Sequence, residues 1–495
     1  MSAQVAAGLT PAQLGRARRA WYVYDWANSA YVTTTSTVLF SPYLTAVAEA
    51  AACPGGVGEV VRDGATTCPV PLSVLGIPVA AGSLALYVVT FATLLSAVVL
   101  PAVGAVADRS RSPRRLMTGF AWVGAAAAAA MVFVVGDRWV LGAALQLVAS
   151  LCLGASLVVY DSLLVRLAGP AERDRVSSRG WALGYAGGAV LLAANLVLLA
   201  QAGSVGLDEG SAVRVSLLSA GLWWGAFTLV THLGLRRLDG EPAVVALEGP
   251  GGTPPASTAR VVAGSLGQLV RTLKGAPAFP QTLLFLIAYL FFNDGVQTVI
   301  AAASIYGQQQ LGFASSQLVV AILLVQVVAL LGALAAGWIA QRTSAKATIL
   351  GSLVVWMAVV VAGMVIPAGE FGLFLALAAA IGLVLGGTQA LSRSVFSQLV
   401  PVGREAEWFG LYQSAERGTS WLGTLVFGLV FQLTGSYRPA IASLVVFFVV
   451  GGILLLRVDV ARGRAQAQAG TGTGAGHSAG IQDADGGAAP GGRGR

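Results

Sequence analysis

The chain is built from long apolar runs separated by short polar connections that carry many of the arginines. A run of about 20 apolar residues is long enough to cross a bilayer as a helix. The runs lack the alternation of polar and apolar residues that is typical of barrel strands, so we expect helices. The expected spans cover residues 21–48, 82–106, 115–136, 139–163, 180–202, 213–235, 280–305, 316–340, 347–367, 371–396, 409–434 and 438–457.

A break rich in glycine and proline divides these spans into six and six. The pattern therefore predicts an all-α membrane protein with 12 transmembrane helices in two six-helix bundles. The expected parts are a cytoplasmic arm over residues 1–20, an N-terminal bundle over 21–238, a cytoplasmic linker over 239–278, a C-terminal bundle over 279–458 and a disordered cytoplasmic tail over 459–495. Within the linker, residues 259–274 are expected to form an amphipathic helix at the membrane surface.

Composition agrees with a membrane protein and argues against nucleic acid as a partner. Hydrophobic residues make up 56% of the chain and charged residues 11%, whereas a soluble protein has about 25% charged residues. The net charge of +8 comes mainly from arginines scattered through short loops. The larger arginine groups occupy alternate loops, which predicts that both termini are cytoplasmic. We expect a multi-pass protein of a bacterial cell membrane, with the lipid bilayer as its surroundings.

The run from Thr282 to Ala303 carries a polar stripe through an otherwise apolar helix. Tyr289, Asn293 and Gln297 recur every four residues, and Asp294 lies beside them. Asp294 is expected near the middle of the bilayer, where a carboxylate is costly unless it faces a cavity or a partner. We interpret the stripe as part of a substrate or proton site; the alternative is a structural hydrogen bond or salt bridge between helices.

The first span carries a second polar face. Asp25, Ser29, Thr33 and Thr37 recur at steps of four residues, and Asn28 lies beside them. This face either lines a water path or bonds to backbone carbonyl groups. Asp25 is expected only one turn inside the cytoplasmic edge, which suits a gate residue as well as a substrate contact.

The cysteines suggest a disulfide and no metal site. Cys53 and Cys68 share one long polar loop that is expected outside the cell, where thiols are commonly oxidised. Two free thiols remain the alternative. Since the sequence contains neither a C-x-x-C pair nor a histidine cluster, we expect no metal and no cofactor.

The two halves repeat a short element. Gly104–Arg109 follows the second span, and Gly337–Arg342 follows the eighth, with the same G-x-x-A-x-R pattern. A repeat at matching places indicates two halves related by an axis along the membrane normal. The first copy resembles the motif between the second and third helices of the major facilitator superfamily. This resemblance implies that Asp108 and Arg109 latch the two halves together on the cytoplasmic side.

Further stretches narrow the resemblance. They are Trp21–Tyr31, with the segment Tyr-Asp-Trp-Ala-Asn-Ser, Asn293–Gly295, Gly386–Ser394 and Glu407–Tyr412. Together they resemble the vacuole effluxer-like, autophagy-related family of that superfamily over residues 16 to about 457. Fungal members of the family are associated with amino-acid efflux from the vacuole, so the resemblance implies an efflux transporter.

The polar residues in the spans form two candidate groups. The substrate and proton group comprises Asp294, Asn293, Gln297, Tyr289, Asn28, Thr33, Gln389 and Arg393. The cytoplasmic gate group comprises Asp25, Asp108, Arg109, Asp161, Glu416 and Arg417. The fork of Arg393 suits a substrate carboxylate, and Asp294 suits the coupling proton or an ammonium group. The alternative for the gate group is a network of ion pairs that only closes the inner side.

We therefore expect a monomeric secondary active transporter that moves a small polar solute by alternating access. Amino acids are the expected solute, and proton coupling is expected because an acid buried in lipid without a partner is a candidate proton carrier. The alternatives are an exporter of lipids, drugs or peptides on the same fold, an intramembrane enzyme, and a non-transporting sensor. The chain has no set of residues typical of intramembrane catalysis, so we expect no enzyme. It also lacks the phosphate-binding loop G-x-x-x-x-G-K-[ST], which argues against a primary pump.

Overall fold

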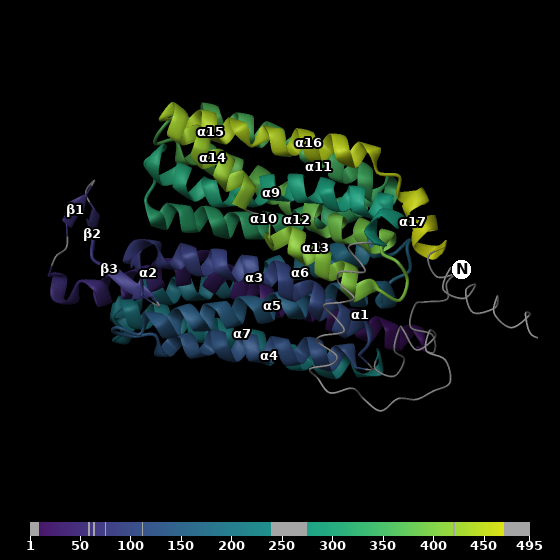
Figure 1. Ribbon diagram of the computed structural model, residues 1–495, viewed down its shortest axis with the longest axis horizontal. Helices are drawn as coiled ribbons and strands as arrows, with labels where there is room; N and C mark the ends of the chain where they lie inside the picture. Colours follow the sequence, from purple (N-terminus) through teal and green to yellow (C-terminus); the bar gives the residue numbers. More distant parts are fainter. Residues whose placement is uncertain are drawn as a thin grey trace, which may run out of the picture.

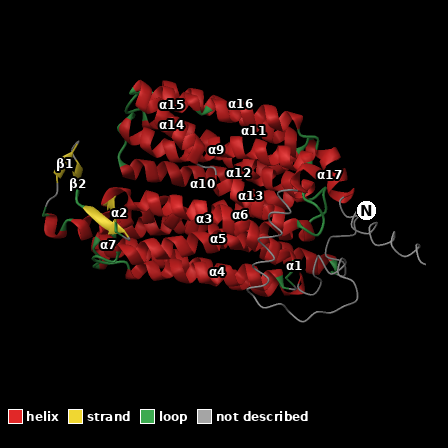
Figure 2. Ribbon diagram, viewed as in Figure 1, coloured by secondary structure: helices red, strands yellow, loops and turns green. Residues whose placement is uncertain are grey.

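The computed structural model consists of two helical bundles that lie side by side, one formed by each half of the chain (Figure 1). The structure describes residues 9–57, 60–62, 65–74, 76–110, 112–238, 275–418 and 421–469. Each half has a large hydrophobic core of its own. Helices make up both bundles, and the strands are confined to one end of the molecule (Figure 2). The predicted all-α architecture of two bundles is confirmed.

The helices follow the predicted spans closely. The N-terminal bundle contains α1 (Pro11–Tyr31), α2 (Phe40–Ala52), α3 (Leu84–Asp108), α4 (Pro113–Ala130), α5 (Trp139–Leu167), α6 (Arg173–Ala200) and α7 (Glu209–Gly234). The C-terminal bundle contains α9 (Pro280–Gln309), α10 (Ser315–Arg342), α11 (Ala345–Val365), α12 (Phe371–Leu399), α13 (Glu405–Gly418), α14 (Trp421–Thr434), α15 (Tyr437–Ser443) and α16 (Val445–Arg457).

Ten helices among the described residues are long and apolar enough to cross a membrane. The two remaining predicted spans, 21–48 and 409–434, are each divided between shorter elements. In the first of them a π-helical segment, Val32–Leu39, joins α1 to α2. In the second, α13 ends at Gly418 and α14 begins at Trp421.

The π-helical segment changes which residues share a face. Its β-branched residues Thr33, Thr34 and Thr35 crowd the preceding turn of a regular helix, and the wider turn shifts the side-chain period. Thr37 is consequently exposed, and its Oγ1 donates to the carbonyl oxygen of Val32 at 3.0 Å. For Thr37, this bond to a backbone carbonyl is one of the two roles that the sequence left open for the polar face.

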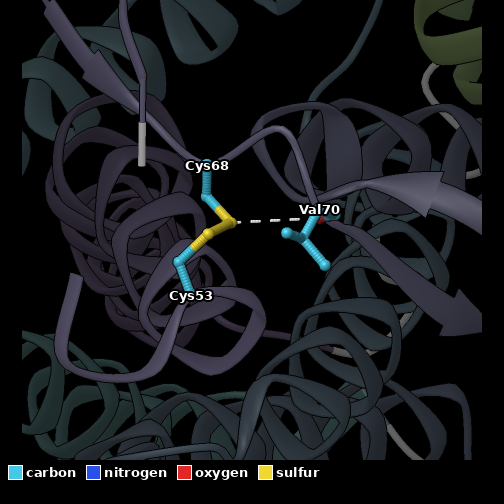
Figure 3. The surroundings of a disulfide bond; sticks show 3 residues. All are labelled: Cys53, Cys68 and Val70. Carbon is cyan, nitrogen blue, oxygen red and sulfur yellow. Dashed lines mark hydrogen bonds between the residues drawn. A yellow bond between two sulfur atoms is a disulfide. The ribbon is translucent and has the colours of Figure 1, made fainter. Parts of the chain in front are cut away.

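The connection between α2 and α3 carries two β-hairpins, where the sequence pattern predicts one polar loop. Strands β1 (Val60–Arg62) and β2 (Ala65–Thr67) pair antiparallel, as do β3 (Pro71–Val74) and β4 (Ile77–Ala80). A disulfide joins Cys53 to Cys68 beside Val70 (Figure 3). We call this end of the molecule, on the left in Figure 1, the hairpin end.

Helix α17 (Val460–Ala469) marks the opposite end, the α17 end, near the start of α1 (Figure 1). It packs against α12 and α9, and Gly463 lies close to Leu399 and Gln281. The expectation of a disordered tail is therefore wrong for Val460–Ala469, because this segment forms a helix that packs against α12 and α9. Residues 470–495 and the predicted amphipathic helix at 259–274 lie outside the described residues.

The start of α1 is fixed to the loop between α5 and α6 by Arg18. Its Nη2 pairs with Glu172 Oε2 at 2.5 Å, and its Nε donates to the carbonyl oxygen of Leu167 at 2.8 Å. The hydrogen bonds from Arg18 lower the pKa of Glu172 below its usual value of 4.5. A carboxylate whose pKa is lowered on folding stabilises the folded state at pH values above its pKa in the unfolded chain. This contribution disappears as the pH falls through the pKa of the folded state.

We predict that Glu172→Gln lowers thermal stability at pH 6.5 and that the difference from wild type shrinks towards zero at pH 3.5. Glutamine keeps the size of the side chain but not its charge, so the variant lacks the pH-dependent stabilisation that the ionised Glu172 provides. The Glu172 side chain is 39% exposed, so the effect at pH 6.5 should stay below about 1 kcal/mol. Unfolding midpoints of the detergent-solubilised proteins at both pH values measure it. A difference that grows on acidification contradicts the assignment.

Candidate functional site

Arg393 of α12 is the centre of a buried ion cluster between the two halves. Its Nη1 pairs with Asp161 of α5 at 3.1 Å, and its Nη2 pairs with Asp25 of α1 at 3.4 Å. Its Nε donates to Ser177 Oγ of α6 at 2.9 Å, and its Nη2 donates to the carbonyl oxygen of Ser177 at 3.1 Å. We call these four residues the Arg393 cluster. It connects one helix of the C-terminal half to three helices of the N-terminal half.

Aromatic rings surround the guanidinium of Arg393. Its central carbon lies 4.8 Å from the ring centre of Trp21, 5.4 Å from that of Tyr160 and 5.5 Å from that of Trp181. Rings at these distances attract a cation. The Tyr160 hydroxyl also donates to Asp25 Oδ2 at 2.6 Å. The rings keep the ionic groups dry, so each charge depends on the others for compensation.

The Arg393 cluster is a strong contact only while all three of its charged groups are present. Asp25 is 6% exposed, Asp161 2% and Arg393 2%, so all three are removed from water. Taking one partner away from a buried ion pair costs about 3–5 kcal/mol, because the remaining charge is left without compensation. Here two carboxylates share one arginine, so loss of Arg393 leaves two buried acids facing each other.

Two further hydrogen bonds close the α17 end between α6 and α12. Ser177 Oγ donates to the carbonyl oxygen of Ala390 at 2.6 Å. Arg173 Nη1 donates to the carbonyl oxygen of Ser397, also at 2.6 Å. Together with the Arg393 cluster, they hold the two halves in contact at this end.

Asp108 forms a second contact between the two halves at the same end. Its carboxylate accepts hydrogen bonds from the backbone N–H groups of Ala406 and Glu407, both at 2.8 Å. These groups lie in the first turn of α13, where the helix dipole favours a negative charge. A Cβ on Gly104 would overlap the carbonyl oxygen of Ala406, so the glycine permits this approach. Arg109 is exposed and joins no ion pair with any residue that the structure describes.

The polar stripe of α9 forms the start of a hydrogen-bonded seam. The Tyr289 hydroxyl donates to Gln389 Oε1 at 3.3 Å, and Gln389 Nε2 donates to Asn293 Oδ1 at 2.8 Å. Asn293 Nδ2 in turn donates to the carbonyl oxygen of Glu416 at 3.2 Å. The seam therefore links α9 to both α12 and α13.

Gln413 connects this seam to the Arg393 cluster. Its Nε2 donates to Asp161 Oδ2 at 2.8 Å and to Glu416 Oε2 at 3.2 Å. Arg417 Nε donates to Gln413 Oε1 at 3.3 Å. Hydrogen bonds therefore lead from Asn293 on α9, by way of Glu416 and Gln413, to Asp161 of the Arg393 cluster.

Asp294 lies at the middle of α9 and is fully buried. Its Oδ2 accepts a hydrogen bond from the backbone N–H of Gly423 at 2.6 Å. Gly423 is the third residue of α14, so the carboxylate lies at the positive end of that helix. Asp294 Oδ1 and Thr298 Oγ1 have no hydrogen-bond partner among the described residues. The acid is thus compensated by a helix end and keeps one free oxygen.

The remaining predicted residues are more dispersed. Asn28 Nδ2 donates to the carbonyl oxygen of Tyr24 in its own helix at 2.6 Å. Thr33 Oγ1 accepts from Gln326 Nε2 of α10 at 2.6 Å, which is another contact between the halves. Gln297 is half-buried on α9. Arg393 was expected in the substrate group, and the structure places it together with the gate residues Asp25 and Asp161.

Sequence reasoning missed Ser177 and Gln326. Gln326 is an isolated polar side chain in the apolar run of α10, and that isolation was a usable signal. Ser177 offers no comparable signal, because serine is common in helices and its role depends on the partner that packs against it. Among the described residues, no group of three or more histidine, cysteine, aspartate or glutamate side chains could hold a metal ion.

Comparison with known proteins gives consistent matches over nearly the whole chain. Residues 15–468 match the family described as vacuole effluxer Atg22 like. The MFS-type transporter YxiO of Bacillus subtilis is 30% identical, over 88% of this chain and 93% of that protein. Autophagy-related protein 22-1 of Penicillium rubens is 26% identical, over 90% of each.

Solved structures agree on the fold. The proton:xylose symporter XylE, a major facilitator superfamily protein, matches with a TM-score of 0.64 at 10% identity, over 91% of this chain and 96% of that one. The transporter FucP in its outward conformation matches with a TM-score of 0.60 at 10% identity, over 90% of this chain and 98% of that one. At this level of identity the likeness shows the major facilitator fold and leaves the solute open.

We predict that Arg393→Met lowers stability by about 3–5 kcal/mol, because it leaves Asp25 and Asp161 buried without compensation. Adding Asp25→Asn and Asp161→Asn to the same protein should recover most of the loss. Unfolding midpoints of the single and triple variants in detergent measure both effects. If Arg393→Met unfolds at the wild-type temperature, the cluster does not hold the two halves together.

Proposed function

Because the chain belongs to the vacuole effluxer Atg22-like family, whose members include MFS-type transporters, we propose that it exports amino acids with proton coupling. The chain is a transporter of the major facilitator type that works by alternating access. The finer proposal concerns its solute, its coupling ion and its orientation. The observation that carries it is the free carboxylate oxygen of Asp294, fully buried at the middle of α9.

Asp294 suits a coupling proton because its charge state controls a helix contact. The ionised carboxylate is held by the N–H of Gly423 and by the positive end of α14. Protonation at Oδ1 removes the negative charge, so the attraction to α14 weakens. The neighbouring Asn293 bonds to α13, so a shift of α14 relative to α9 also affects the seam. We infer that proton binding at Asp294 loosens the α17 end through this route.

The Arg393 cluster suits a zwitterion once the α17 end opens. Opening separates Arg393 on α12 from Asp25 and Asp161 on α1 and α5. The C-terminal half then presents a cation and the N-terminal half presents two anions. The carboxylate and the ammonium of one amino acid supply both missing partners. A bound zwitterion therefore stabilises the opened state. Without a bound solute, the opened state is costly because its buried charges have no partners.

The proposed location is the bacterial cell membrane, with both termini in the cytoplasm. The arginine-rich loops cluster at the α17 end, as expected for a cytoplasmic face. The disulfide between Cys53 and Cys68 lies at the hairpin end, as expected for an oxidising compartment. Two independent features thus favour the same orientation.

We predict that Asp294→Asn abolishes amino-acid flux driven by a pH gradient in proteoliposomes, with at least a tenfold loss. Exchange of labelled for unlabelled amino acid should persist, because exchange requires no net proton movement. Asp208→Asn is the matched control, since Asp208 is an exposed acid that caps α7 at the hairpin end. Unchanged pH-driven flux in Asp294→Asn removes this acid from the coupling mechanism. Flux of hydrophobic cations but of no amino acid favours drug export instead.

We predict that a membrane-impermeant maleimide labels Cys53 and Cys68 in intact cells only after treatment with an impermeant reductant. The variant with both residues changed to serine is the control, because the half-buried Cys152 remains in it. Labelling without a reductant contradicts the disulfide. Labelling only after cell lysis places the hairpin end in the cytoplasm and contradicts the orientation.

A further inference from the structure

The second copy of the repeated element differs from the first at its acid. In the first half, Asp108 accepts two hydrogen bonds from the first turn of α13. In the second half, Gln341 stands at the matching place, and α10 packs against α6. Helix α6 begins at Arg173 without a side-chain cap. The carboxylate that holds the first contact has therefore no counterpart in the second.

A cavity of about 310 Å³ lies at this second contact. Helix α6 contributes Arg175, Ser178 and Arg179 to its walls, and α10 contributes Trp338 and Gln341. The cavity therefore spans the boundary between the N-terminal and C-terminal halves, at the α17 end.

The walls of the cavity carry a surplus of positive charge. Arg175 and Arg179 are both exposed. Arg175 pairs with Glu172 at 3.3 Å, with side chains 45% and 39% exposed, so water screens that pair strongly. Arg342, one residue beyond Gln341, lies 3.6 Å above the ring of Trp338. Three arginines at one boundary form an attractive place for an anion.

Ser178 provides an independent indication of a ligand. It is 1% exposed, lines the cavity, and its Oγ has no hydrogen-bond partner among the described residues. Buried hydroxyl groups without a partner are rare in native proteins and call for an explanation. A Cβ on Gly337 would crowd Ser178 Oγ at 2.6 Å, so the glycine keeps this side of the serine open.

The outer side of the site is apolar and faces the membrane. Trp338 is 56% exposed and Leu334 is 43% exposed, on the surface of α10 next to the cavity. Tryptophan is typical of the level of the lipid headgroups. Basic pockets between transmembrane helices on the cytoplasmic side are suited to anionic headgroups.

We propose that this cavity binds the phosphate of an anionic phospholipid from the cytoplasmic leaflet. Arg175, Arg179 and the hydroxyl of Ser178 hold the phosphate, and the acyl chains lie along Leu334 and Trp338. The phosphate takes the place that the Asp108 carboxylate occupies in the first half. A lipid bound there bridges α6 and α10 and so stabilises contact between the halves. Only the assignment to the cytoplasmic leaflet rests on the orientation proposed above.

The test measures the thermal stability of the purified full-length protein in detergent with added phosphatidylglycerol or phosphatidylcholine. Phosphatidylglycerol should raise the unfolding midpoint by several degrees, because a ligand of the native state stabilises it. Phosphatidylcholine should have little effect. In Arg175→Gln/Arg179→Gln the shift should vanish. Arg236→Gln/Arg237→Gln is the matched control, since it removes two exposed arginines from the same end outside the cavity and should retain the shift.

The Ser178→Ala variant tests whether the buried hydroxyl binds a ligand or is only an unpaired group. If the hydroxyl binds phosphate, the variant should show a weaker response to phosphatidylglycerol, with about a tenfold loss in apparent affinity. If the hydroxyl is only an unpaired group, the variant gains stability without lipid and responds like wild type, which overturns its role.

Three outcomes overturn the lipid proposal. The first is an equal response to both lipids, and the second is an unchanged response in Arg175→Gln/Arg179→Gln. The third is a shift of the same size with inorganic phosphate alone, which assigns the cavity to a free anion. None of these measurements depends on transport, so the proposal can fail while the proposed function stands.

Discussion

The guanidinium of Arg393, shared by Asp25 and Asp161, is the interaction on which the described arrangement depends. It places one cation of the C-terminal half between two acids of the N-terminal half, behind a wall of aromatic rings. Buried charges are stable only while their partners stay in place. The same contact that closes the α17 end therefore makes its opening costly unless other charges replace the lost ones. This condition links the opening of the protein to the chemistry of its solute.

Asp294 illustrates a second way to hold a charge in a membrane protein. Sequence reasoning considered an opposite side chain or a water-filled cavity as the means of compensation. The structure instead uses the start of α14, whose backbone N–H groups have no partner within their own helix. The division of this span into α13 and α14 creates that helix end at the depth of the acid. A helix break that weakens the span in isolation thus provides the partner for Asp294.

The fold was predictable because bilayer thickness and backbone hydrogen bonding restrict the outcome severely. The contact of Asp108 was predictable because the sequence around it resembles the motif between the second and third helices of the major facilitator superfamily. The π-helical segment Val32–Leu39 was not, since the expected span 21–48 assumed one regular helix. Helix α17 was missed because its composition resembles that of a disordered tail, and only its packing against α12 and α9 distinguishes it. The partners of Arg393 could not be chosen from sequence, because several acids lay at similar expected depth.

The repeat also shows why two halves of similar design need not behave alike. In the first half, the contact at the α17 end is made by the protein itself, through Asp108 and the first turn of α13. In the second half, Gln341 carries no charge, and the facing part of α6 carries Arg175, Arg179 and a serine whose hydroxyl has no partner among the described residues. A contact built only from groups of the protein itself has a fixed strength. A contact completed by a molecule from the membrane has a strength that follows membrane composition, by mass action. The substitution of glutamine for aspartate thus converts one of two equivalent latches into one that depends on its surroundings.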